Sequence, residues 1–457
     1  MEQPSLERGS QAGATGATPA SAARLLRVLG VAFGVAVIVG NTIGIGILRT
    51  PGEIAARLPS VPLFLGVWVL GGLYALVGAL SLAELGAMLP RSGGQYVFVR
   101  RALGEYPGFV VGWSDWLSTC GTLAALGIVI GEYADPLVAA LAGREVYTAA
   151  AVVVAFAGLQ WRGVKLGDVA QQATSLLKAL ALIGLAALGL LLVPVASAAA
   201  AAPAAAATTP AGFALLAPAV VALQAAIFTY DGWTGPIYFG EEVRDAGRNV
   251  PRAMIGGVLL VLAIYLALNA AFLRVVPIGE MAGDPFVAAT VASRLFGPAG
   301  DTVIRILMIV SLLAAVNANQ LMASRVPFAM SRDRLLPAVV TRVNDGGTPV
   351  VSLLLGTLVA LGFILTNTFE SVLALLAFFF VANYALSFTS VFVLRRREPA
   401  AERPFRVPLY PWTTAVALLG SIAFLVAAVL GDHANSLRAL ALLAASLPAY
   451  LAVRRRR

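Results

Sequence analysis

Three glycines interrupt the first apolar run of this 457-residue chain, a run that is long enough to cross a bilayer. Gly40, Gly44 and Gly46 fall in the string VGNTIGIGI, and glycine costs a helix interior about 1 kcal/mol relative to alanine. The helix is therefore predicted to break, which frees backbone N–H groups that could hold an anion such as a carboxylate. The alternative is a close helix-packing face, which the GxxxG spacing of Gly40 and Gly44 would also suit.

A second interruption, FTYDGWTGP, runs from Phe228 to Pro236 and contains an acid. An acid inside a membrane span is costly, so Asp231 is a candidate functional residue. If it faces a substrate cavity, Asp231 would favour a cationic side chain or help to hold an ammonium group. The alternative is an N-cap of the helix that follows, which is worth about 1 kcal/mol. Tyr230 and Trp233 could line the same site or serve only as packing.

Lys178 lies about seven residues into the fifth apolar run, roughly 10 Å from the cytoplasmic end of that run at 1.5 Å per residue. At this depth its ammonium could bridge carbonyls of the broken first helix to span eight, in the place of a bound sodium ion. Desolvation would also help it to release a proton, which gives Lys178 a predicted coupling role. The alternative is an anchor that snorkels to the membrane surface.

The composition is that of an integral membrane protein. Hydrophobic residues make up 59% of the chain and charged residues 12%, with a mean hydropathy of +0.87. One cysteine, Cys120, and one histidine, His433, make a disulfide framework or a metal site unexpected. Without a metal-ligand cluster, a GxSxG nucleophile elbow or a usable histidine, we expect neither an enzyme nor a cofactor.

Apolar runs of about 20 residues, the length that spans a bilayer, predict twelve transmembrane helices. They lie at residues 30–56, 62–88, 107–134, 147–163, 170–194, 213–240, 253–276, 302–331, 349–368, 371–394, 412–430 and 435–453. The first and sixth spans hold the two interruptions. Because five is odd, two groups of five spans must run in opposite senses, and broken helices at matching places predict a transport site between inverted halves.

Most of the 32 Lys and Arg residues fall on one side of the membrane if the N-terminus is cytoplasmic. Both termini are therefore predicted to be cytoplasmic, and the net charge of +9 indicates topology rather than nucleic-acid binding. The expected domains are a disordered cytoplasmic tail at 1–26, a first inverted repeat at 27–195, an extracytoplasmic Ala/Pro linker at 196–212, a second repeat at 213–394, spans eleven and twelve at 395–453, and a basic cytoplasmic tail at 454–457.

Two charged segments are predicted at the cytoplasmic side. One follows span six and consists of Glu241, Glu242, Arg244, Asp245, Arg248 and Arg252. These side chains could form a network that locks an inward gate, with simple surface solvation as the alternative. The other is the proline-stiffened loop RPFRVP at 403–408, which would suit the anionic headgroups of membrane lipids.

Five ordered strings carry a resemblance to a known family. They are GNTIGIGILRTPGEIA, AELGAMLPRSGGQYVFVRRALG, FTYDGWTGPIYFGEEVRDAGRNVPRA, ASRVPFAMSRDRLLP and SVFVLRRREPAAERPFRVPLYPW. Through them the chain, from about residue 27 to about 410, resembles the amino acid–polyamine–organocation superfamily, and most of all its L-type amino acid transporter branch. The resemblance implies an all-α fold of the LeuT type: a five-plus-five inverted repeat with discontinuous helices 1 and 6, plus two extra helices.

The resemblance also implies a function. The protein would move L-amino acids across the cell membrane by alternating access, as an exchanger or a proton-coupled symporter. The family carries a lysine at the place of Lys178, which implies that transport is independent of sodium. Alternatives are a polyamine or cationic amino acid transporter and a non-transporting amino acid sensor. A polyamine has no carboxylate, however, so the glycine-rich amides would have little purpose. Any partner subunit is unknown.

The site residues are carried over by position. By analogy the substrate carboxylate would bind the backbone amides of Gly44, Ile45 and Gly46. Its ammonium would meet carbonyls near Ile43 and near residues Phe228 to Tyr230. Ile45 departs from the serine or alanine often found there, which removes a hydroxyl and narrows the pocket. The other residues expected at the site are Phe228 as an aromatic gate, Tyr230, Asp231, Gly232 and Trp233.

Overall fold

The computed structural model describes residues 25–193, 212–366, 369–431 and 433–455. Within these ranges the regular structure is helical, with no strand and three isolated bridges. Nearly all of the expected N-terminal tail, most of the Ala/Pro linker and the last two residues of the basic tail lie outside the described residues.

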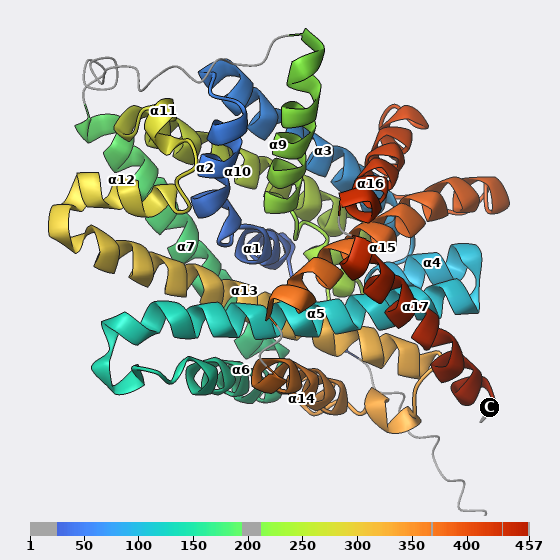
Figure 1. Ribbon diagram of the computed structural model, residues 1–457. Coiled ribbons are helices and arrows are strands. Elements are labelled where there is room, and N and C mark those ends of the chain that lie inside the picture. Colours follow the sequence, from blue (N-terminus) through green and yellow to red (C-terminus); the bar gives the residue numbers. More distant parts are fainter. Residues whose placement is uncertain (1–24, 194–211, 367–368, 432, 456–457) are drawn as a thin grey trace, which may run out of the picture.

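The chain is a succession of helices, shown in order of colour in Figure 1. The first half comprises α1 (Val31–Thr42), α2 (Gly46–Arg57), α3 (Val61–Met88), α4 (Gln95–Leu103), α5 (Glu105–Ala134), η1 (Asp135–Leu137), η2 (Ala139–Leu141), α6 (Glu145–Trp161) and α7 (Val164–Leu192). The second comprises η3 (Gly212–Leu215), α9 (Leu216–Thr229), η4 (Gly235–Tyr238), α10 (Ala246–Val275), α11 (Ile278–Met281), α12 (Val287–Phe296), η5 (Gly297–Ala299), α13 (Gly300–Arg332), η6 (Ala338–Thr341), α14 (Val350–Thr366) and α15 (Phe369–Arg397). The chain ends with α16 (Trp412–Gly431) and α17 (His433–Arg454).

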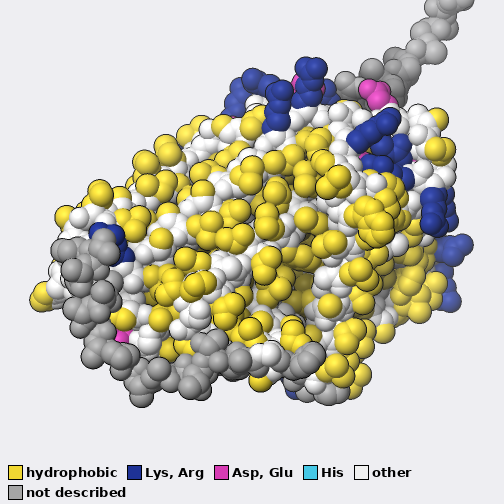
Figure 2. Space-filling model, turned by 90° about the horizontal axis from the view of Figure 1, so that it is seen from above, with side chains coloured by type: hydrophobic (Ala, Val, Ile, Leu, Met, Phe, Trp, Pro, Cys, Tyr) yellow, Lys and Arg dark blue, Asp and Glu magenta, His cyan; other side chains and the backbone are white. Residues whose placement is uncertain are grey.

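Many of these helices could cross a membrane. Of the described helices, 8 are long and apolar enough, and the bent pair of α1 and α2 would bring the number to 9. Three shorter apolar helices, α6, α9 and α14, overlap the predicted spans four, six and nine. Figure 2 shows a broad hydrophobic face with Lys and Arg side chains gathered toward one side. An all-α membrane protein is thus confirmed, whereas twelve crossings and the LeuT-type topology stay predictions.

Helices from the two predicted repeats pack in matching pairs. The pairs are α3 with α10, α5 with α13, and α6 with α14. The third and eighth predicted spans, α5 and α13, run side by side across Figure 1. Two shorter helices hold equivalent places, because α4 packs on α5 and α12 packs on α13. Such packing is expected when two halves with the same order of elements face each other. The inverted repeat itself stays a prediction.

The two last helices lie outside these pairs, and one buried acid holds the loop that precedes them. α16 packs on α15 and α3, and α17 packs on α15 and α5. Glu84 of α3 accepts hydrogen bonds from Arg395 Nε at 2.8 Å and from the Val407 N–H at 2.7 Å, and it pairs with Arg403 at 3.3 Å. The Arg403 side chain is 5% exposed. The expectation that the whole 403–408 loop suits lipid headgroups is therefore wrong for Arg403, since Glu84 binds it inside the protein.

Candidate functional site

The first helix breaks where its glycines predicted. α1 ends at Thr42 and α2 begins at Gly46, with a bend of 50° between them, and residues 43–45 form what we call the first break. Within the described residues, the backbone N–H groups of Gly44, Ile45, Gly46 and Ile47 donate no hydrogen bond. A helix N-terminus with free N–H groups attracts negative charge, so the first break can accept an anion such as a carboxylate.

The glycines of this segment have different tasks. A Cβ on Gly40 would lie 2.1 Å from Gln171 Nε2 and 2.7 Å from Ser175 Oγ of α7, whereas a Cβ on Gly44 would meet no atom within 4 Å. A Cβ on Gly46 would lie 2.9 Å from Cγ2 of Thr229. Gly40 thus has the packing role that the GxxxG spacing suggests, while Gly44 lies in the open part of the break. Helix packing, the alternative interpretation of this segment, thus applies to Gly40, and the predicted helix break applies to Gly44.

Lys178 binds backbone carbonyls at the end of α1, beside the same break. Its side chain is fully buried, and Nζ donates to the Gly40 carbonyl at 2.8 Å and to the Ile43 carbonyl at 2.5 Å. The Ser311 hydroxyl of α13 donates to the same Ile43 oxygen at 3.1 Å. The ammonium therefore lies inside the protein and does not snorkel to its surface. It joins α7 to the broken helix, and Ser311 of the eighth predicted span shares the carbonyl. A coupling role for Lys178 stays a prediction.

The second break, residues 230–234, lies directly against the first. α9 ends at Thr229, and η4 begins at Gly235. Gly232 has a φ of +114°, and a Cβ there would lie 2.9 Å from the backbone N of Thr42, so only glycine suits this approach. The Tyr265 hydroxyl lies 2.9 Å from the Thr42 carbonyl and 3.0 Å from the Thr229 carbonyl, between the ends of α1 and α9. One tyrosine of α10 therefore bridges both half-helices.

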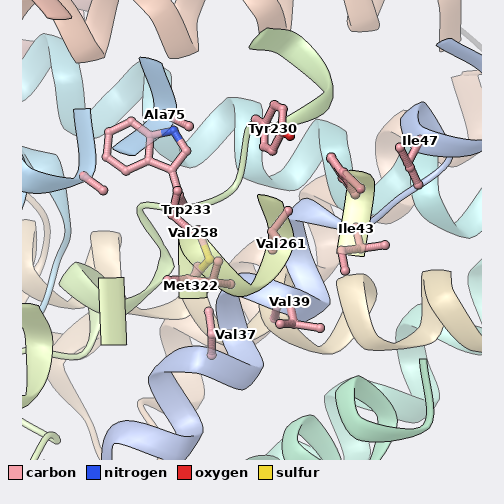
Figure 3. Close-up of a cluster of buried hydrophobic side chains, with 14 of the residues drawn as sticks. Val37, Val39, Ile43, Ile47, Ala75, Tyr230, Trp233, Val258, Val261 and Met322 are labelled. Atoms are coloured by element: carbon pink, nitrogen blue, oxygen red, sulfur yellow. The ribbon is translucent and has the colours of Figure 1, made fainter. Parts of the chain in front are cut away.

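Figure 3 shows side chains of both breaks in one cluster, with Ile43, Ile47, Tyr230 and Trp233 among them. Tyr230 is 1% exposed, and its hydroxyl has no hydrogen-bond partner among the described residues. Its ring packs against Tyr265 at 4.8 Å and Trp68 at 6.2 Å between centroids. Tyr230 therefore contributes an aromatic wall with a free hydroxyl. Ile43 is fully buried, whereas Gly44, Ile45 and Gly46 are only partly buried.

Asp231 lines a cavity of about 570 Å³, to which Trp233 of this cluster also contributes. Its carboxylate accepts a hydrogen bond from the Tyr384 hydroxyl of α15, and the Tyr384 ring stacks on Trp233 at 5.2 Å. No side chain caps η4, whose N-cap residue is Thr234, so the N-cap interpretation of Asp231 is wrong. Phe228 lines the same cavity and is 47% exposed. Of the predicted site residues, Phe228 and Asp231 line this cavity and Ile43 and Tyr230 lie in the buried cluster, while Trp233 belongs to both.

The acids expected to form a charge network after the second break do form ion pairs, but their partners are arginines in the C-terminal part of α13. Glu242 and Arg325 form a buried bidentate pair with distances of 3.0 and 2.8 Å, and Glu241 pairs with Arg332 at 2.7 Å. Among the described residues, Arg244, Arg248 and Arg252 form no ion pair. The network therefore ties the segment after η4 to α13, and the expectation that the arginines of that segment take part is wrong.

Another acid, Asp333, connects the end of α13 to α4 and to the residues before it. Asp333, just after α13, pairs with Arg91 at 3.1 Å and Arg100 at 3.0 Å, and it accepts a hydrogen bond from the Tyr96 hydroxyl at 2.9 Å. Burial and the neighbouring Asp333 carboxylate raise the pKa of the Tyr96 hydroxyl well above its usual range, so it remains a donor. Leu29, just before α1, pairs with Val243 in a parallel bridge. These contacts join α4 to the end of α13, and the segment before α1 to the segment after η4.

Sequence reasoning missed three residues that hold the breaks: Tyr265, Ser311 and Tyr384. Each lies in an apolar helix in which tyrosine or serine is common, and none stands beside a glycine, a proline or a charge. Their importance comes only from the carbonyl or carboxylate that they reach in another helix. The sequence carried no local signal that could have found them.

Comparisons with known proteins show which proteins this chain resembles in sequence. A family model described as amino acid permease matches residues 27–444. The serine/threonine exchanger SteT of Bacillus subtilis (strain 168) is 28% identical over 439 residues, which cover 95% of this chain and 98% of that protein. The b(0,+)-type amino acid transporter 1 of Mus musculus is 26% identical over 443 residues, covering 95% and 89%. The large neutral amino acids transporter small subunit 2 of Mus musculus is 27% identical over 391 residues, covering 84% and 73%.

Proposed function

The chain belongs to the amino acid permease family, and from this premise we propose that it is a sodium-independent secondary transporter of L-amino acids in the cell membrane, working by alternating access. Family members and relatives are transporters and not enzymes. Two of the relatives are named as amino acid transporters and one as an exchanger. We take exchange as the leading mode for this chain, with proton-coupled symport as the alternative.

The first break carries this proposal. Four free N–H groups at the start of α2 provide donors for a substrate carboxylate without any side-chain charge. Because every α-amino acid has this carboxylate, the same donors would serve many substrates. Backbone donors inside an apolar protein are also poorly solvated, which strengthens their hydrogen bonds to an anion. Gly44, Ile45 and Gly46 are thus the proposed carboxylate site.

The ammonium group requires acceptors nearby. The Ile43 carbonyl already accepts from Lys178 and Ser311, which fill both of its lone pairs. The carbonyls of Thr42 and Thr229 share a single hydroxyl, that of Tyr265, and so keep acceptor capacity. We therefore place the ammonium at the ends of α1 and α9, near Thr42 and Thr229, and assign Ile43 to the scaffold that Lys178 holds.

Lys178 supports the proposal that sodium is not needed. Its ammonium occupies a buried point between α7 and the first break and binds two backbone carbonyls there. A metal cation at the same point would use the same oxygen ligands, and two positive charges so close would repel each other. The matched helix pairs α3–α10 and α5–α13 support the inverted repeat through which alternating access would occur.

Asp231 gives a specific reason to keep a second candidate, a transporter of cationic amino acids or polyamines. It is the one acid among the residues that line the 570 Å³ cavity, and the remaining lining is largely apolar. A lysine or arginine side chain could place its charge on this carboxylate while its alkyl stem lies along apolar walls. A polyamine would leave the N–H groups of the first break without an anion, so we favour an amino acid.

Counterflow in proteoliposomes tests the proposed function. Vesicles preloaded with unlabelled L-serine should accumulate labelled L-serine against its gradient, equally well with and without sodium. Symport would instead be shown by uptake into empty vesicles that depends on an imposed proton gradient. Binding without any counterflow, measured as a ligand-dependent rise in thermal stability, would favour a sensor. A matched screen of lysine, arginine and polyamines would then separate the two substrate classes.

A further inference from the structure

We propose that a polar cavity beside α2 is a capture site for zwitterionic amino acids, in which Arg49 binds the substrate carboxylate before it reaches the first break. This inference rests on the proposed function, because it concerns the same substrates. The cavity has a volume of about 340 Å³ and is lined by Arg49, Thr50, Glu53, Ala56, Arg57, Gly283, Asp284 and Pro285. Its size falls in the range typical of small-molecule pockets.

Arg49 is the unusual member of this lining. Its side chain is exposed, and it forms no ion pair with any carboxylate among the described residues. The guanidinium lies 5.8 Å from the centroid of the Phe286 ring, which holds it over an aromatic surface. Arg57, by contrast, pairs with Glu53 at 3.1 Å. The Arg49 side chain also hydrogen-bonds the Tyr133 hydroxyl. Because none of its partners among the described residues is a carboxylate, Arg49 can still offer its charge and further donors to one.

The position of Arg49 links the cavity to the proposed carboxylate site. Arg49 follows Gly46 by one helical turn, which corresponds to a rise of about 4.5 Å. Gly46, Arg49, Thr50, Glu53 and Arg57 recur at helical spacing, and all of them are partly or fully exposed. One face of α2 therefore forms a continuous polar path from the cavity to the free N–H groups, although its opposite face is buried in the core.

The opposite wall of the cavity is a short loop pinned against α2. The Gly283 N–H donates to the Gly52 carbonyl at 3.0 Å, and a Cβ on Gly52 would lie 2.0 Å from the Asp284 carbonyl oxygen. Asp284 is held in turn, because it accepts from the Phe286 N–H at 2.8 Å and the Thr290 hydroxyl at 2.6 Å. The cavity thus has a fixed wall that carries one acidic group, Asp284, while its other acid, Glu53, lies on α2 with Arg49.

These charges match a zwitterion better than a simple anion or cation. A carboxylate can bind Arg49, while the ammonium of the same molecule finds an acceptor in Glu53 or Asp284 across the cavity. A polyamine would be repelled by Arg49, and a dicarboxylate by the two acids. Thr229 packs against the Gly46 end of this path, both beside Gly46 and through its hydroxyl, which lies 3.1 Å from that of Thr50. Passage to the first break then requires α9 to move.

A cysteine in place of Arg49 tests both the charge and its accessibility. Cys120, the only cysteine of the chain, is buried, so an introduced cysteine can be modified selectively. In Arg49→Cys, the KM for labelled L-serine exchange should rise roughly tenfold with little change in maximal rate, because one charged hydrogen-bonding partner is lost. A trimethylammonium-ethyl methanethiosulfonate added outside cells should partly restore the KM, because it returns the positive charge but no hydrogen-bond donor, whereas the sulfonatoethyl reagent should not. Excess L-serine should slow both reactions.

The matched control is Arg144→Cys, an exposed arginine in the turn before α6, for which neither the variant nor the reagents should alter KM. The wild-type KM should also rise with ionic strength, and the KM of Arg49→Cys should rise less. Normal wild-type exchange together with an unchanged KM in Arg49→Cys, or equal effects of the two reagents, would overturn the capture site alone. A wild-type chain that neither exchanges nor binds any amino acid would overturn the proposed function as well.

Discussion

The two helix breaks lie side by side, yet they present different chemistry. The first offers four backbone N–H groups and carbonyls that Lys178 and Ser311 hold in place. The second offers side chains: Asp231 bound by Tyr384, and Trp233 stacked on that tyrosine. Backbone groups recognise what all amino acids share, whereas side chains recognise what distinguishes them. We infer that the first break supports binding in general and the second supports selectivity.

The strongest way to disrupt the first break is Lys178→Ala. The change leaves the Gly40 carbonyl without its buried donor and the Ile43 carbonyl with Ser311 alone, at a cost of about 1–3 kcal/mol for the unpaired group, and it leaves a cavity. We expect counterflow to fall by more than roughly tenfold and the Tm of the purified protein to drop. Ser311→Ala, which removes the second donor to Ile43, is the matched variant and should have a smaller effect. Unchanged exchange in Lys178→Ala would contradict this assignment.

A pair of alanine variants tests whether contact between the breaks matters. Gly46→Ala places a Cβ 2.9 Å from Thr229 Cγ2, so α9 or α2 must shift, at a cost of about 1–3 kcal/mol. Gly44→Ala adds the same methyl group where no atom lies within 4 Å. We expect Gly46→Ala to reduce exchange the more strongly of the two, measured as initial rates at matched protein levels. Equal losses would mean that glycine flexibility, and not the close contact with Thr229, determines the effect.

Asp231→Asn should change selectivity while leaving general binding in place. We expect the ratio of exchange rates for arginine and serine to fall by roughly tenfold, because an amide cannot pair with a cationic side chain. Tyr384→Phe, which keeps the carboxylate but removes its hydrogen bond, should alter this ratio less. Competition assays in which arginine and serine are present together measure this ratio of exchange rates. If Asp231→Asn slows exchange of both substrates equally, the second break does not distinguish substrates by their side chains.

Tyr265→Phe should produce the smallest effect of the series. It removes one hydroxyl that lies between the Thr42 and Thr229 carbonyls and leaves the aromatic packing intact. We expect a loss of about 1 kcal/mol in stability and a slightly lower Tm. If the substrate ammonium displaces this hydroxyl, as proposed, the KM for serine should change little or fall. A large rise in KM would instead assign Tyr265 a direct role in holding the substrate.

Much of the architecture could be predicted because its signals are local. Hydropathy marks an apolar run wherever it occurs, and the glycines around Gly44 and Gly232 mark the positions where a helix cannot continue. The depth of Lys178 in its run was likewise readable from residue counting. These properties depend on neighbouring residues and on the length of a span, so a single sequence suffices to find them.

Partners across the fold were decided only by the tertiary structure. Glu242 was expected to pair with nearby arginines but binds Arg325, 83 residues away, and Asp231 faces Tyr384 instead of capping η4. Arg49 lines a cavity and has no acidic partner among the described residues, and neither property could be read from its neighbours in the sequence. The physical reason is that charge pairing depends on distance and burial in space, and helix packing determines both.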